Sequence, residues 1–69
     1  MNERLYNQIA KKYQPAIKDI YKDEDGYWCQ LDPDGAYRLD GYYSEHIVHE
    51  DTMKEIKAVL RNHLVAVTS

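Results

Sequence analysis

Residues 25–43 read DGYWCQLDPDGAYRLDGYY, and this stretch decides the fold. It holds three turn signals, Asp25-Gly26, Pro33-Asp34-Gly35 and Asp40-Gly41, which separate short runs rich in aromatic and aliphatic side chains. Such runs between glycine-ended turns are typical of antiparallel strands joined by tight hairpins. The stretch therefore predicts an antiparallel meander of three strands. Residues 16–22 could form either a short helix or a fourth strand, and we favour the strand.

The turns also predict how the strands pair. A two-residue turn at Asp25-Gly26 would set Ile20 opposite Leu31, and the next turn would set Leu31 opposite Tyr37. Because side chains alternate between the two faces of a strand, these pairings divide the sheet into a core face and an outer face. The residues predicted for the core face are Ile20, Tyr27, Cys29, Leu31, Tyr37, Leu39 and Tyr42.

Two helices are predicted to flank the meander. Apolar residues recur at spacings of three and four from Asn2 to Tyr13, and Pro15 ends this first helix. The second helix is predicted from Thr52 to His63, because Thr52 and Glu55 have the spacing of a capping box and an apolar stripe follows. Residues 64–67 either extend this helix or pack as a tail.

The predicted architecture is a two-layer α+β domain spanning residues 1–69, with an N-terminal helix, a three- or four-stranded antiparallel meander and a C-terminal helix. A chain of 69 residues has a small core, so a second copy or a partner that covers apolar surface would add materially to its stability. The sequence has no bilayer-length apolar run, no apolar leader and only one cysteine, Cys29. We therefore expect a cytoplasmic location.

Charge is distributed unevenly along the chain. Between Asp23 and Asp51 there are nine carboxylates and one cation, Arg38, whereas both flanking segments are net basic. Opposite charges steer association, so carboxylates in the turns suit a basic partner. We name six of them the acidic rim: Asp23, Glu24, Asp25, Asp32, Asp34 and Asp40.

The outer face of the predicted sheet carries two large rings on a polar surface. A two-residue turn at Asp40-Gly41 would set Arg38 opposite Tyr43, with Trp28 on the neighbouring strand. Trp, Tyr and Arg are the residue types enriched at binding hot spots. The alternative is that the rings cover one another or pack under a terminus. The predicted interface comprises Trp28, Gln30, Arg38, Tyr43 and Glu45.

The histidines raise the hypothesis of a metal site. His46 and His49 precede Glu50 and Asp51, and His63 follows in the second predicted helix. An extended segment between His46 and His49 would point them to opposite sides, which opposes a shared ligand set. We therefore expect surface or capping histidines and no metal site.

Two aspartate-glycine runs resemble parts of a calcium loop. Residues 23–26 and 32–35 each read Asp-x-Asp-Gly, but position 1 of the first loop frame is Tyr21 and position 12 of the second is Gly41, where calcium requires oxygen ligands. We interpret both as turns. Cys29 falls on the predicted core face, and no phosphate loop or nucleophile motif is found, so we expect neither an enzyme nor a cofactor.

The segments Asp25-Gly26-Tyr27-Trp28 and His49-Glu50-Asp51-Thr52 resemble a pattern in small uncharacterised proteins of phages and mobile elements of Gram-positive bacteria. The resemblance covers mainly residues 17–61 and brings no catalytic residue or ligand. It implies an inhibitor or accessory factor that binds a host protein. The expected function is non-catalytic protein binding, either as a homodimer through the outer face or to a basic partner through the acidic rim.

A weak nucleic-acid-binding module is the alternative function. Phosphate binding is driven by cations, and acidic turns oppose base stacking on the sheet, so we expect nucleic acid to be a less favoured partner than protein. The cations that would serve this alternative lie in the predicted helices or beside them: Lys11, Lys12, Lys18, Lys54, Lys57 and Arg61.

Overall fold

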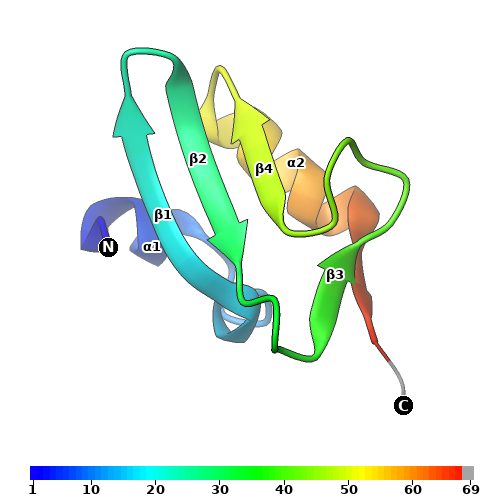
Figure 1. Cartoon of the computed structure of the whole chain (residues 1–69). Coiled ribbons are helices and arrows are strands. Elements are labelled where there is room, and N and C mark those ends of the chain that lie inside the picture. Colours follow the sequence, from blue (N-terminus) through cyan, green and yellow to red (C-terminus); the bar gives the residue numbers. More distant parts are fainter. Residues whose placement is uncertain (68–69) are drawn as a thin grey trace.

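The computed structural model describes residues 1–67 and confirms the α+β class (Figure 1). In chain order its elements are α1 (Glu3–Gln8), the 3-10 helix η1 (Gln14–Ala16), β1 (Ile17–Asp23), β2 (Gly26–Leu31), β3 (Tyr37–Leu39), β4 (Ile47–Glu50), α2 (Met53–His63) and β5 (Leu64–Ala66). The antiparallel strands β1, β2 and β4 form a three-stranded sheet in that order, and β3 pairs with β5 in a second sheet. Figure 1 shows α1 behind β1 and α2 behind β4, so both helices cover the same face of the three-stranded sheet.

The β1–β2 hairpin confirms the fourth strand but corrects its register. Asp23 pairs with Gly26, so the turn residues are Glu24-Asp25. Ile20 pairs with Cys29, whereas its predicted partner, Leu31, is two residues further along β2. The Oδ1 atom of Asp23 accepts a hydrogen bond from the Asp25 N–H at 2.9 Å, which fixes the turn one residue earlier than expected. A displacement of two residues preserves the face of every side chain, so the predicted division into core and outer faces survives.

The predicted continuation of the meander is wrong. In β3, Leu39 pairs with Leu64 of β5, whereas in β2, Cys29 pairs with Val48 of β4. The predicted strand at residues 42–43 is an irregular loop. The observed pairing places both Leu39 and Val48 in the core, at 2% and 0% exposure. A single meander would have left Val48 outside the sheet.

The first helix ends at Gln8 rather than at Tyr13. The side-chain amide of Gln14 donates hydrogen bonds to the carbonyl oxygens of Tyr6 and Ile9, at 3.2 and 3.0 Å. Carbonyls in the last turn of a helix have no helical partner, and Gln14 supplies one. The chain therefore leaves the helix after two turns and crosses towards α2.

The second helix begins as predicted. Thr52 is its N-cap, and its Oγ1 atom accepts a hydrogen bond from the Glu55 N–H at 3.2 Å. Of the two alternatives for the residues after it, extension of the helix is wrong, because residues 64–66 form β5. The buried face of α2 consists of Met53, Ile56, Val59 and Leu60.

The core lies between the three-stranded sheet and the helices. The aliphatic and thiol side chains predicted for it are buried, with Ile20, Cys29 and Leu31 at 0% exposure. The tyrosines predicted for it are half-buried at its margin, where each hydroxyl can reach water or a polar partner. These margin residues are Tyr27, Tyr37 and Tyr42.

Candidate functional site

Three rings lie side by side across the outer face of the three-stranded sheet. Tyr21 of β1 is opposite Trp28 of β2, and Trp28 is opposite His49 of β4. The Tyr21 and Trp28 rings have centroids 6.3 Å apart and planes 13° apart, and the Trp28 and His49 rings have centroids 3.9 Å apart and planes 10° apart. We name Tyr21, Trp28 and His49 the aromatic row.

The aromatic row is on the face that the helices leave uncovered. The helices α1 and α2 pack on the opposite face, behind the strands in Figure 1. Tyr21 is 40% exposed, and Ile47, which pairs with Gln30 at the border of the row, is 41% exposed. Sequence reasoning placed Trp28 on this face but missed Tyr21 and His49, because the correct strand pairing is needed to align them with the indole.

The imidazole of His49 is held in a fixed orientation. Its Nε2 atom lies 2.8 Å from the carbonyl oxygen of Asp25 in the β1–β2 turn. A carbonyl oxygen only accepts hydrogen bonds, so Nε2 carries the proton and donates it. The turn thus positions the ring that covers one face of Trp28.

Negative charge lies at the end of the aromatic row. The indole N–H of Trp28 is buried and makes no hydrogen bond of regular geometry within residues 1–67, but it is near the Asp23 carboxylate. The pKa of Asp23 is lowered, first by this N–H and then by the backbone N–H of Asp25, both of which favour the ionised carboxylate. Asp23 is therefore charged at neutral pH.

The structure does not gather the five predicted interface residues on one sheet. Trp28 and Gln30 are on β2 and share its outer face. Arg38 belongs to β3 in the second sheet, where Val65 is opposite it, and both Tyr43 and Glu45 are in the loop before β4. The prediction depended on the meander register, which is the part of the fold that proved wrong.

The acidic rim is divided between separate turns. Asp23, Glu24 and Asp25 lie at the β1–β2 turn, whereas residues 32–34 lie at the opposite end of β2 (Figure 1). Asp40 follows β3 and forms an ion pair with Arg38, with 3.4 Å between Oδ1 and Nη1. All six carboxylates are exposed, but only the first three border the aromatic row.

Tyr42 lies along the free edge of β4, next to His49. Its hydroxyl accepts a hydrogen bond from the His49 N–H at 3.3 Å and donates one to Oε2 of Glu50 at 2.5 Å. The pKa of Tyr42 is raised to about 12, first by burial and then by the hydrogen bond to Glu50. The Tyr43 ring meets that of Tyr42 edge-on with centroids 5.3 Å apart and is itself 98% exposed.

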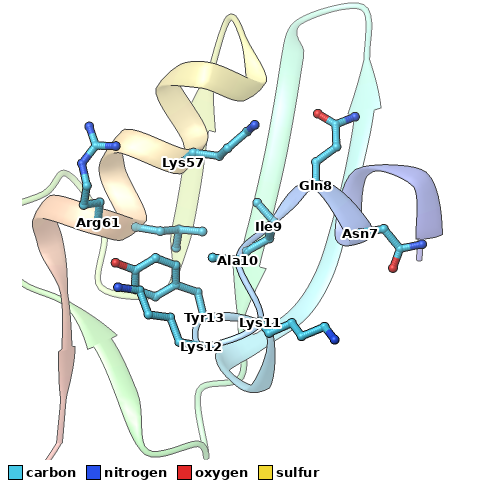
Figure 2. Close-up of a pocket in the computed structure, with 10 residues that line it drawn as sticks. Asn7, Gln8, Ile9, Ala10, Lys11, Lys12, Tyr13, Lys57 and Arg61 are labelled. Carbon is cyan, nitrogen blue, oxygen red and sulfur yellow. The ribbon is translucent and has the colours of Figure 1, made fainter.

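A second candidate site lies on the helical side of the molecule. A cleft of about 510 Å³ separates the segment 7–13 from α2 (Figure 2). Four of the six cations that sequence analysis singled out line it, namely Lys11, Lys12, Lys57 and Arg61, and no carboxylate does. We name this space the basic cleft.

Within residues 1–67, no three side chains of the metal-binding types are arranged to hold an ion. His49 and His63 instead use one ring nitrogen each to bond a backbone carbonyl, that of Asp25 and that of Asp40. The two aspartate-glycine runs are turns, as predicted, since Asp23 and Asp32 each accept a hydrogen bond from the N–H two residues later. In this part of the chain, neither helix is long and apolar enough to traverse a bilayer.

Comparison with known proteins gives no relative on which to base a function. The chain matched no protein-family model, no curated protein and no solved structure.

Proposed function

We propose that the protein is a non-catalytic binding module whose outer sheet face docks on a basic protein partner. The aromatic row is the observation that carries this proposal. It places Tyr21, Trp28 and His49 in stacked order on a face that the protein's own helices leave uncovered. Tyr and Trp are the side chains that contribute most at protein interfaces.

The row is preorganised for binding. His49 is fixed by the Asp25 carbonyl, and Trp28 is held between His49 and Tyr21. Rings that are already ordered lose little conformational entropy when a partner covers them. Together with the exposed side chain of Ile47, they form an apolar patch with polar neighbours, which is the usual anatomy of an interface.

Charge favours a basic partner over a second copy. Alternation along β1 places Asp23 on the same face as Tyr21, and Asp25 lies in the adjoining turn. The outer positions next to the aromatic row, Gln30 of β2 and Ile47 of β4, carry no positive charge. A two-fold dimer through this face would bring two such sets of carboxylates together, whereas a basic partner would neutralise them.

The resemblance to small proteins of phages and mobile elements supports the same function. Proteins of that origin are often inhibitors or accessory factors that bind a host protein. A cytoplasmic host protein is the simplest target, because the single cysteine, Cys29, is a free and buried thiol.

Capture from a bacterial lysate on the immobilised full chain tests the proposal, with matched variants deciding which surface is used. We expect a discrete basic protein that Trp28→Ala and Tyr21→Ala fail to retain and that elutes as ionic strength rises. Tyr43→Ala is the control, because it removes an even more exposed ring, 98% exposed against 40% for Tyr21, that lies outside the row.

Two outcomes would overturn the proposal. One is equal capture by the wild type and both row variants. The other is a dimeric mass in light scattering that Trp28→Ala converts to a monomer, since this would show that a second copy occupies the face. Circular dichroism of each variant establishes that it is folded.

A further inference from the structure

The basic cleft brings together cations that lie far apart in the sequence. Lys12 belongs to the segment after α1, whereas Lys57 and Arg61 lie one turn apart on α2. Like charges placed side by side repel one another, and the chain as a whole is acidic, with a net charge of −3. Their convergence on one cleft therefore indicates an anionic ligand.

No carboxylate within residues 1–67 is paired with these cations. The ion pairs within residues 1–67 are those of the Met1 amino group with Asp19 and of Arg38 with Asp40. In this part of the chain, no Asp or Glu oxygen lies within 4.0 Å of the charged nitrogens of Lys12, Lys57 or Arg61. Their charges are available to a ligand.

Figure 2 shows how the side chains are disposed around the cleft. Lys57 extends from α2 towards the segment that carries Gln8, whereas the Arg61 guanidinium points away from that segment in this view. Lys12 and Tyr13 belong to the facing wall of the cleft. Lys11 points away from α2, so we leave it out of the site.

The inner part of the cleft is apolar. Ile9 and Leu60, 3% and 0% exposed, close its floor, and Tyr13 supplies a half-buried ring. The Lys12 ammonium lies 5.0 Å from the centroid of that ring, a cation–π distance that keeps both groups at the site. A ligand that fits must therefore combine an anionic group with a flat or apolar part.

We propose that the basic cleft binds a small phosphorylated ligand of the nucleotide class. The phosphate lies between Lys57 and Arg61, whose guanidinium fork matches phosphate oxygens, with Lys12 adding a third positive charge. The flat organic part lies against Tyr13. A volume of about 510 Å³ is in the range of small-molecule sites.

The same observations disfavour a nucleic-acid chain as the ligand. A polyanion that extends beyond the cleft would gain little from the rest of the surface, because the net charge of the protein is negative and the turns are acidic. The phosphate of a mononucleotide would contact only the cations of the basic cleft.

Titration of the ¹⁵N-labelled full chain with AMP tests the proposal. We expect AMP to shift the backbone amides of residues 9–13 and 57–61, inorganic phosphate to shift mainly the second set, and adenosine to shift neither set appreciably. Lys57→Gln and Arg61→Gln should each weaken AMP binding about tenfold, the expected effect of losing one charge-assisted contact of about 1.4 kcal/mol.

Lys54→Gln is the matched control, because Lys54 is an exposed lysine on the same helix that does not line the cleft. It should leave AMP binding nearly unchanged. The proposal is wrong if AMP shifts none of these amides at millimolar concentration, or if Lys54→Gln weakens binding as much as Lys57→Gln. If single-stranded DNA binds more tightly than AMP, with an affinity that increases with its length, the proposal is wrong and the protein is instead a nucleic-acid-binding module.

Discussion

The Trp28 indole lies against the His49 imidazole, with ring centroids 3.9 Å apart and planes 10° apart. The two residues are directly opposite each other in β2 and β4, and the Asp25 carbonyl holds the imidazole from the neighbouring turn. His49, in the edge strand β4, thus orients Trp28, the only tryptophan of the chain. Because there is one indole, its fluorescence reports on the surroundings of Trp28, to which His49 contributes the nearest ring.

Removing the imidazole should expose the indole to water. We expect His49→Ala to shift the emission of Trp28 to longer wavelength and to increase its quenching by acrylamide, while the domain stays folded. His63→Ala is the control, since His63 bonds the Asp40 carbonyl and is not stacked on Trp28. Unchanged emission in His49→Ala would contradict the stacking.

Truncation of Leu31 should destabilise the protein strongly. Leu31 is 0% exposed in the core, and a large-to-small change there costs about 2 to 5 kcal/mol in the free energy of unfolding. Urea denaturation followed by circular dichroism measures the loss. Tyr43→Ala should change the free energy by less than about 0.5 kcal/mol, because Tyr43 is 98% exposed. A loss below about 1 kcal/mol for Leu31→Ala would contradict its place in the core.

Gly26 should not tolerate a side chain. Its φ is +127°, and a Cβ atom would lie 2.8 Å from the carbonyl oxygen of Glu50 in β4. We therefore expect Gly26→Ala to lower the free energy of unfolding by more than about 1 kcal/mol. Gly35→Ala should cost less, because the φ of Gly35 is not positive and its Cβ would lie 3.1 Å, rather than 2.8 Å, from the nearest carbonyl oxygen. Equal losses in a thermal or urea denaturation series would refute the role of Gly26.

Ionisation of Tyr42 should destabilise the fold at high pH. Its folded-state pKa of about 12 is above the ordinary value of 10.0, so folding favours the neutral phenol. The contribution of this phenol to stability is present below pH 10 and is lost as pH rises from about 10 to 12. The difference in free energy of unfolding between wild type and Tyr42→Phe should therefore shrink over this range. A difference that is constant with pH would show that the phenol titrates normally.

The Cys29 thiol should be unreactive in the folded protein. Burial raises its pKa to about 12, with a smaller contribution from the charge of Asp19, and the side chain is 0% exposed. We expect an aromatic disulfide reagent at pH 8 to modify it only as fast as the chain unfolds. Leu31→Ala should accelerate the reaction by raising the unfolded fraction. Immediate stoichiometric labelling of the wild type would contradict the burial.

The parts of the fold that the sequence predicted depend on short-range chemistry. The Thr52 cap needs only Glu55 three residues later, and the turns after Asp23 and Asp32 need only an N–H two residues away. The faces of β2 survived an error of register because the error was an even number of residues. The outward position of Trp28 was predictable for this reason.

The parts that failed depend on contacts between distant residues. Leu39 pairs with Leu64 across 25 positions, and three residues of β5 carry too weak a pattern to predict such a strand. The first helix is shortened by a side-chain amide, that of Gln14, whose bonds no helical periodicity reveals. The aromatic row and the basic cleft both require the final arrangement of strands and helices.

The Tyr42 hydroxyl also has a consequence for solubility. An outermost strand normally leaves peptide groups ready to recruit the same strand of another molecule, which is how amyloid-like stacking begins. At His49, the phenol bonds the N–H and lies 3.1 Å from the C=O, so a side chain stands in for the missing neighbour. Loss of this cover in Tyr42→Ala would leave a self-templating edge, and the expected phenotype is fibril formation at protein concentrations where the wild type remains dispersed.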